Sequence, residues 1–161
     1  MKISNKKKGK RGSIAIMEVI HIFIVVMVFA MLSDLIVIGW QYIGVTRASN
    51  EISRMVGIQS GVERSTPSNY PGGAAAYHTS SELTSYFSDK VDDLGLEAGW
   101  LQINGRTLTG SISIEGDYRQ DIDITTTCEY KWNLLGRFIP ALKNGRTIVV
   151  NKTVFGEYKR D

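Results

Sequence analysis

The chain has 161 residues and a formal net charge of +3, an average that would suggest a basic protein bound to nucleic acid. The average conceals an asymmetry: the first 13 residues carry six basic side chains and no acid, which leaves 13 basic against 16 acidic residues in the rest. The basic character is therefore a tail and not a surface, and we expect no nucleic-acid partner. The single cysteine, Cys128, excludes an intramolecular disulfide, so the folded part must be stabilised by packing.

The stretch from Ile14 to Gly61 predicts one long helix whose first half is a membrane anchor. Between Val19 and Trp40 the apolar run is interrupted only by His21, Ser33 and Asp34, and it is close to the ~20 residues that cross a hydrocarbon core. After Trp40 we expect the helix to leave the membrane as an amphipathic stalk. The packing stripe predicted along this stalk consists of Ile43, Ala48, Ile52, Met55 and Val56.

Basic residues directly before an apolar span favour a cytoplasmic N-terminus, because cationic flanks set the orientation of the span. Anionic lipid headgroups would reinforce the same placement. A nuclear-import or RNA-binding arm is the other interpretation of such a run, and the adjacent span disfavours it. A secretory signal peptide is also disfavoured, because the apolar run exceeds the usual 7–15 residues and no A-x-A site follows.

The chain divides into a basic cytoplasmic tail over 1–13, disordered from Met1 to Arg11, a transmembrane helix and stalk over 14–61, a linker over 62–78 and an extracytoplasmic head over 79–161. Proline and glycine break the helical pattern in the linker. The head begins with a helix over 79–94, because Thr79 and Glu82 form a T-x-x-E capping box and Gly95 supplies a stop.

Alternating apolar and polar residues predict a sheet in the remainder of the head. Asn104-Gly105 is a hairpin turn signal, the longest alternating strand runs over 122–132, and a last strand is expected over 147–158. The fold class is therefore α+β, with a long N-terminal helix and a small head in which one helix packs on an antiparallel sheet of three to four strands.

Both ends of the chain resemble a known family. Basic residues, Gly12, a short apolar run, Glu18 and a continuous apolar helix resemble the class III signal of type IV prepilins and TadE-like pseudopilins. The C-terminal half is similar to the end of TadE-like proteins, where a strand with a Tyr, a Pro-containing loop and a final strand end in a basic-acidic cluster. The resemblance implies a pilin-like head and a bacterial cytoplasmic membrane.

The resemblance also implies a processing and assembly site. In the family, a prepilin-type peptidase cuts after a small residue and leaves a Glu at the fifth mature position; Glu18 would be sixth after a cut at Gly12 and fifth after a cut at Ser13. Glu18 would then neutralise the freed α-amino group of a neighbouring subunit in a buried ion pair. The alternative is that Glu18 lies at the interface and faces headgroups.

Two further polar residues lie in the span. His21 follows Glu18 by three residues and shares its helix face, which gives a Glu-x-x-His pair of the kind found in di-metal bundles, but one copy predicts no metal site. Asp34 lies in the second half of the span, so it should point into a helix bundle with a basic partner or sit near the outer headgroups.

The chemistry of an enzyme is missing from the sequence. Neither a phosphate-binding loop, a CxxC pair nor HExxH is present. An acidic group could ligate Ca²⁺ but matches no EF-hand loop, so we interpret it as a solvated face; it consists of Glu115, Asp117, Asp121 and Asp123. Cys128 falls in a strand pattern and is expected to be buried. We expect no catalytic residue, no cofactor and no metal.

Two functions follow from these observations. The leading prediction is a pseudopilin-like structural subunit of a Tad or type IV pilus-like filament or secretion apparatus, which packs on other pilin-like subunits through its N-terminal helix. The alternative is an unprocessed single-pass accessory protein whose outer head binds another component of a secretion or conjugation machine. N-terminal processing and the effect of Glu18→Ala on assembly distinguish them.

Overall fold

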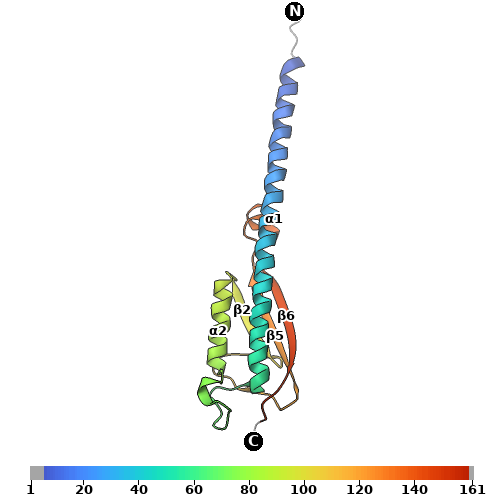
Figure 1. The fold of residues 1–161 in the computed structure, drawn as a ribbon. Helices are drawn as coiled ribbons and strands as arrows, with labels where there is room; N and C mark the ends of the chain where they lie inside the picture. The colour runs from blue at the N-terminus through green and yellow to red at the C-terminus, as the bar shows by residue number, and fades with distance from the viewer. Residues whose placement is uncertain (1–5, 160–161) are drawn as a thin grey trace, which may run out of the picture.

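The molecule is built along one helix, α1 (Lys6–Gln59), in a computed structural model that describes the backbone of residues 6–159 and the side chains of residues 15–159. The N-terminal part of α1 projects beyond the rest of the molecule, and its C-terminal part lies against the head (Figure 1). The helix begins eight residues before the predicted start at Ile14, because Lys and Arg are good helix formers. A disordered tail is therefore wrong from Lys6 onwards, and residues 1–5 lie outside the described residues.

Helix α1 ends at Gln59 because the next two residues leave the helical region of backbone space. Ser60 and Gly61 have φ values of 53° and 112°. A Cβ at Gly61 would overlap the carbonyl oxygen of Ile114, so only glycine fits this turn. Gly61 and Val62 then form β1, which pairs antiparallel with β4 (Ile114–Glu115).

The segment predicted as a linker is folded onto the head. It contains β1 and a short helix, η1 (Gly73–Ala75). The rings of Tyr70 and Tyr77 are buried and meet edge to face with centroids 4.9 Å apart, and Tyr70 contacts Tyr158 in the same way at 5.0 Å. Aromatic packing thus fixes a stretch whose Pro and Gly content suggested a free connection.

Helix α2 (Ser80–Asp93) confirms the predicted second helix and its cap. Thr79 Oγ1 accepts a hydrogen bond from Glu82 N at 3.3 Å, and Glu82 Oε2 accepts one from Thr79 N at 2.8 Å. Gly95 follows with a φ of 64°, the left-handed conformation that ends helices. The buried face of α2 presents Leu83, Phe87 and Val91.

Among the described residues the main sheet has four antiparallel strands, within the predicted three to four, and the structure gives their order as β3-β2-β5-β6. They are β2 (Ala98–Ile103), β3 (Arg106–Thr107), β5 (Asp121–Tyr130) and β6 (Arg146–Phe155). The hairpin turn is confirmed, because Asn104 and Gly105 have φ values of 49° and 73°, as the favoured two-residue turn requires. Strands β5 and β6 pair along their full length, from Asp121 opposite Phe155 to Tyr130 opposite Arg146.

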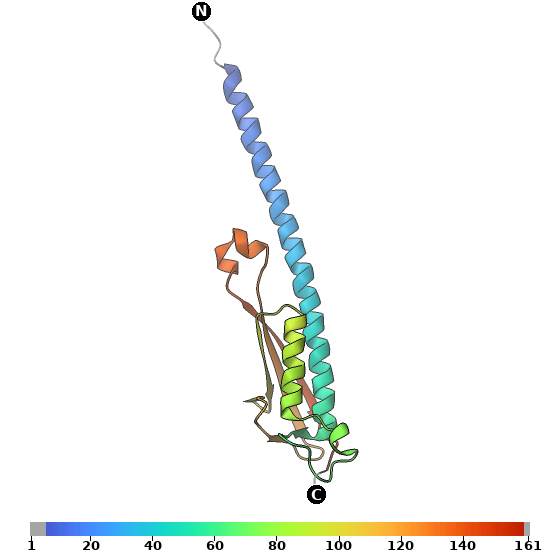
Figure 2. The ribbon, with the colours of Figure 1, turned by 90° about the vertical axis from the view of Figure 1, so that its left-hand side faces the viewer.

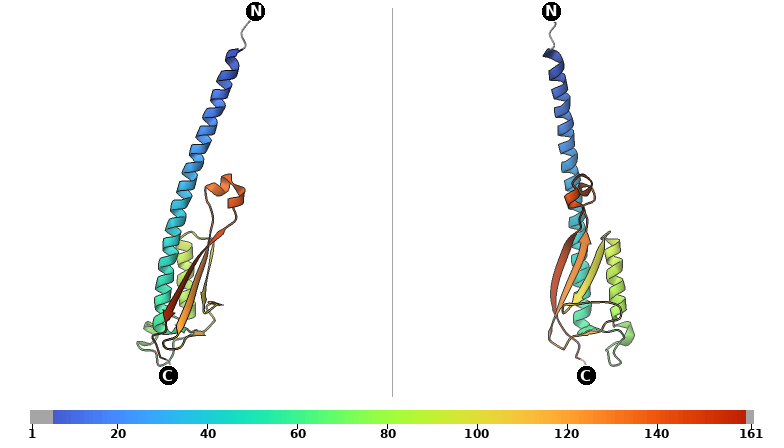
Figure 3. Two further views of the ribbon diagram at one scale, coloured as in Figure 1. Left: turned by 90° about the vertical axis from the view of Figure 1, so that its right-hand side faces the viewer. Right: turned by 180° about the vertical axis from the view of Figure 1, so that it is seen from behind.

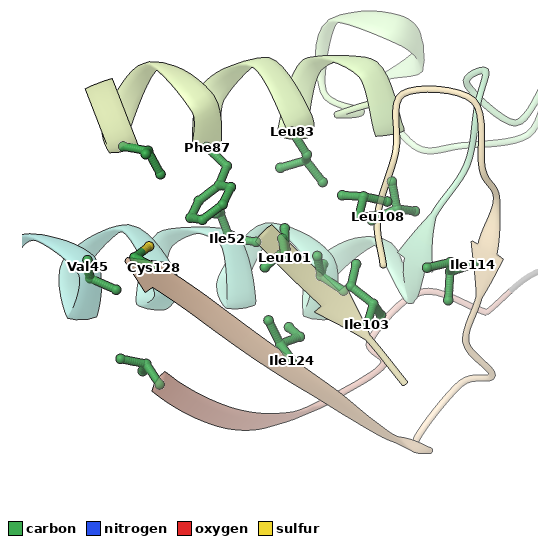
Figure 4. Close-up of a cluster of buried hydrophobic side chains, with 14 of the residues drawn as sticks. Val45, Ile52, Leu83, Phe87, Leu101, Ile103, Leu108, Ile114, Ile124 and Cys128 are labelled. Atoms are coloured by element: carbon green, nitrogen blue, oxygen red, sulfur yellow. The ribbon is translucent and has the colours of Figure 1, made fainter. Parts of the chain in front are cut away.

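Helices α1 and α2 lie over one face of this sheet (Figures 2 and 3). The core between the helices and the sheet takes Val45 and Ile52 from α1 (Figure 4), together with Val56. The predicted stalk stripe is therefore wrong as an intersubunit surface: Ala48, Ile52 and Val56 are buried in their own head, while Ile43 is exposed on another side of the helix. The physical reason is that an apolar stripe is buried by the nearest apolar surface, and that surface is the chain's own sheet.

The connection from β5 to β6 turns back along α1, away from the rest of the head (orange in Figures 2 and 3). It contains α3 (Leu135–Phe138) and η2 (Pro140–Leu142). Residues 132–142 of this connection are called the tip below. The fold is thus α+β, with a long apolar N-terminal helix and a small antiparallel sheet.

Candidate functional site

Within residues 15–159, α1 is the one helix long and apolar enough to cross a membrane. Large apolar side chains between Ile16 and Trp40 are exposed around its circumference. A soluble helix buries such residues on one face, whereas a helix that is apolar all round needs an apolar surrounding. Length and composition are therefore compatible with a membrane anchor.

Among the described side chains of α1, five polar residues are buried; one of them, Ser53, has an unpaired hydroxyl, and the other four bind the head from one face of the helix, called the inner face. They lie within roughly 80° of one another at 100° per residue. Each holds a different part of the head, and the four are Asp34, Gln41, Ser49 and Gln59.

Asp34 is 3% exposed and binds the start of α3. Its carboxylate accepts hydrogen bonds from the backbone N–H groups of Leu134 at 3.1 Å and Leu135 at 2.8 Å. The first N–H groups of a helix have no partner within the helix, and a carboxylate satisfies them with a charge-assisted bond. The sequence predicted a basic partner or outer headgroups for Asp34; the structure instead supplies two amides of the same chain, 100 and 101 residues away.

Gln41 binds the C-terminal end of α2. Its side-chain amide donates to the carbonyl oxygens of Leu94 at 3.1 Å and Gly95 at 3.4 Å. The last carbonyls of a helix also lack internal partners, so this contact fastens α2 to α1. Gly44, one turn further, lets the helices approach, because a Cβ there would overlap the side chain of Leu94.

Ser49 and Gln59 complete the inner face. The Thr126 hydroxyl on β5 donates to Ser49 Oγ at 3.1 Å in a fully buried position. Gln59 Oε1 accepts from the backbone N–H of His78 at 2.6 Å, and its Nε2 donates to the His78 carbonyl at 3.0 Å. Because buried polar groups are costly when unpaired, these bonds fix the register of α1 on the head.

The opposite side of α1, called the outer face, carries Glu18. At 100° per residue Glu18 lies roughly 160° round the helix from Asp34, and its side chain is exposed. Exposed apolar residues follow it at alternating spacings of three and four, the pattern by which helices pack on one another. This seam consists of Ile22, Val25, Phe29, Leu32, Ile36 and Ile43. Gly39 interrupts it with open space where a side chain would be.

The other predicted site residues are not brought together with Glu18. His21 Nδ1 lies 2.9 Å from the carbonyl oxygen of Met17 and donates to its own helix. Gly12 and Ser13 lie in the helical backbone of α1, and their surroundings fall outside the described side chains. Among the described residues no group of three or more His, Cys, Asp or Glu could hold a metal ion.

Several titratable groups on β5, α2 and α1 are buried or hydrogen-bonded within the head, or are exposed on its surface. Cys128 is buried, as the strand pattern predicted, and this burial raises the pKa of its thiol to about 11, so the thiol is protonated at neutral pH. Tyr86 on α2 donates a hydrogen bond to Glu51 on α1. Burial first, and then the hydrogen bond to Glu51 and its charge, raise the pKa of Tyr86 to about 12. Asp121 and Asp123 are exposed on β5, and Asp123 Oδ1 accepts from Thr153 Oγ1 at 2.7 Å.

No protein-family model, curated protein or solved structure matches this chain.

Proposed function

We propose that this chain is a pseudopilin-like structural subunit of a Tad or type IV pilus-like filament or secretion apparatus. Helix α1 would anchor it in a bacterial cytoplasmic membrane, with the basic N-terminus in the cytoplasm and the head outside, as the positive flank of the apolar run favours. Its role would be structural and not catalytic. Its partners would be membrane lipid, a prepilin-type peptidase and other pilin-like subunits.

The observation that carries the proposal is the separation of the two faces of α1. The inner face is occupied by the chain's own sheet, α2 and tip, so it has no room for another subunit. The outer face presents an apolar seam that extends to Ile43, beyond the predicted membrane span. Helices with such a seam associate by packing side chains between those of a neighbour. The same surface would contact lipid before assembly and a neighbouring α1 afterwards.

The position of Glu18 also supports assembly through the outer face of α1. It is the one acidic residue between Ala15 and Ser33, and it lies on the outer face at the start of the seam. A carboxylate in an apolar helix is costly without a partner, and the new α-amino group of a processed neighbour would supply one. The ion pair would set the register in which subunits stack.

The test is assembly in the host. Glu18→Ala should reduce the amount of subunit sheared from the cell surface by about tenfold or more, equivalent to a loss of roughly 1.4 kcal/mol per contact, while the membrane-extracted amount stays unchanged. Glu18→Asp, which keeps the charge, is the matched control and should retain part of the assembly. Normal assembly of Glu18→Ala would refute the pilin-like mechanism.

One observation favours the second candidate, an unprocessed accessory protein whose head binds another machine component. Helix α1 runs without a break through Gly12 and Ser13, and a peptidase needs an extended stretch at the bond it cuts. The intact mass of protein extracted from host membranes decides between the two. A mature chain that starts at Ser13 or Ile14 supports the filament subunit, whereas an intact basic tail supports the accessory protein.

A further inference from the structure

The tip lies beside the part of α1 that is apolar enough to enter a membrane. The ring of Phe138 meets the ring of Phe23 edge to face, with centroids 6.4 Å apart. Asp34 holds the backbone of Leu134 and Leu135. The tip therefore follows α1 from Asp34 back to Phe23, about 16 Å along the axis. Both contact points fall inside the predicted span of 19–40, so a membrane that surrounds this span also meets the tip.

The surface of the tip is apolar. Phe138 is 47% exposed, and Leu134 and Ile139 are exposed beside it. Between the tip and α1 lies a pocket of about 430 Å³ with a wholly apolar lining that includes Ile24 and Met31. Contiguous exposed apolar surface on a soluble loop would be a liability, and it is typical of a site that meets protein or lipid.

Several backbone N–H groups of the tip are hydrogen-bonded within the tip or to α1. Within the tip, N–H groups donate to carbonyls three or four residues earlier, at 3.1 Å from Arg137 to Leu134, 2.8 Å from Ile139 to Leu135 and 2.9 Å from Leu142 to Ile139. Pro140 has no N–H, and Asp34 accepts from the two amides at the start. Backbone within a bilayer must be paired in this way, because no water is available there.

The polar side chains of the tip suit a lipid interface. Arg137 in the tip and Lys143 directly after it are exposed, and long cationic side chains can reach headgroups while their stems lie in apolar surroundings. Trp132 lines the apolar pocket, and its indole N–H has no partner within residues 6–159. Tryptophan is enriched where the acyl chains meet the headgroups, because its ring is apolar and its N–H is polar.

We propose that the tip enters the hydrocarbon core of the bilayer from its outer side together with α1, that lipid acyl chains cover its apolar surface, and that Asp34 is the positioning residue that holds it there. The anchor would then consist of a helix and a re-entrant loop of the head. This requires only that α1 is inserted in the membrane, so it stands whether or not the chain is processed or assembles. A second copy of the chain is the competing occupant of the surface.

The experiment measures which medium surrounds the tip in the full-length protein. In a Cys128→Ser background, Phe138 is replaced by a single cysteine, and this cysteine is labelled with a fluorophore. The labelled protein is reconstituted in vesicles of phosphatidylcholine and phosphatidylglycerol at a low protein-to-lipid ratio. Quenchers are nitroxide-labelled acyl chains and iodide on both sides of the membrane. The matched control is Phe155→Cys, because Phe155 is an exposed aromatic residue on β6, 66% accessible and far from the tip.

The label at 138 should be quenched by the acyl-chain nitroxide and should be at least about threefold less accessible to iodide than the label at 155. Equal iodide access at the two positions would overturn the proposal. Protection that disappears when the protein is diluted in lipid would also overturn it, because it would assign the surface to a second copy.

Asp34 is tested with the same labels. Asp34→Leu leaves the N–H groups of Leu134 and Leu135 without an acceptor, so the label at 138 should regain iodide access while the label at 155 is unchanged. Asp34→Asn keeps an acceptor oxygen and should preserve most of the protection. Resistance to alkaline extraction shows in both variants that α1 is still inserted. A label at 138 that stays in the acyl region of Asp34→Leu would refute the role of Asp34.

Discussion

The two halves of α1 differ in how their apolar side chains are covered, although no break separates them. In the first half, apolar residues surround the helix and most of them remain exposed, so beyond the contact with the tip their cover must come from outside the chain. In the second half, Val45, Ile52 and Val56 follow one face and are covered by the chain's own sheet. One continuous helix can thus combine a half that suits an apolar surrounding with a half that suits water on one face and the protein core on the other. The distribution of polar residues around the helix differs between the two halves.

The polar residues make this difference concrete. On the inner face, Asp34, Gln41, Ser49 and Gln59 are buried and each pairs with a group of the head. In the first half, Glu18 and His21 are exposed, and His21 pairs only with its own helix. Residues of the second half therefore determine the stability of the head, and residues of the first half should affect contacts with lipid or other subunits.

The largest expected effect comes from truncating a side chain of α1 that is buried in the core. Ile52 is fully buried, so Ile52→Ala should lower the free energy of unfolding of the head by about 2–5 kcal/mol. Ile22, 64% exposed in the first half, is the matched control, and Ile22→Ala should change it by less than about 0.5 kcal/mol. Urea unfolding of the detergent-solubilised protein, followed by near-UV circular dichroism, measures both. Equal losses would show that the two halves are not distinct.

Local signals in the sequence predicted the elements they act on. Thr79 and Glu82 placed the start of α2, and Asn104-Gly105 placed the first hairpin, because a cap and a two-residue turn are decided by residues next to each other. The apolar length of α1 likewise predicted an anchor-like helix. The predicted order of helix, hairpin, long strand and last strand is confirmed for the same reason.

Contacts between distant residues could not be predicted in this way. Asp34 looked like an intramembrane acid because nothing near it in the chain indicates Leu134 and Leu135. The stalk stripe combined Ile43 from the outer face with Ile52 from the inner face, and only the position of the sheet separates them. The sequence does contain a signal for the buried face of the stalk, because spacings of three and four place five residues on one side of the helix: Val45, Ser49, Ile52, Val56 and Gln59.

A smaller effect should follow from the buried hydroxyl pair that joins α1 to β5. Ser49→Ala leaves the Thr126 hydroxyl without its buried partner, at a cost of about 1–3 kcal/mol. The double variant Ser49→Ala with Thr126→Val removes both hydroxyls and should recover most of that loss. Thr46→Ala is the control on the same helix, because Thr46 donates only to the Tyr42 carbonyl of α1 in an exposed position. Additive losses in the double variant would show that the two hydroxyls do not interact.

The smallest effect should come from the contact between α1 and α2 at Glu51 and Tyr86, and it should depend on pH. The pKa of Tyr86 is raised from 10.0 to about 12 in the folded state, so folding favours the neutral phenol. Its contribution to stability is therefore complete below about pH 10 and is lost as the pH rises towards 12. The difference in unfolding free energy between the wild type and Tyr86→Phe should shrink over this interval.

Phenolate absorbance tests the cause of that pH dependence. Glu51→Ala removes both the hydrogen bond and the negative charge, so the pKa of Tyr86 should fall, while the part raised by burial should remain. Subtracting the titration of Tyr86→Phe isolates the signal of this one phenol from the other tyrosines. An unchanged pKa in Glu51→Ala would mean that burial alone raises it, and that α1 reaches α2 through Gln41 and apolar packing without a contribution from Glu51.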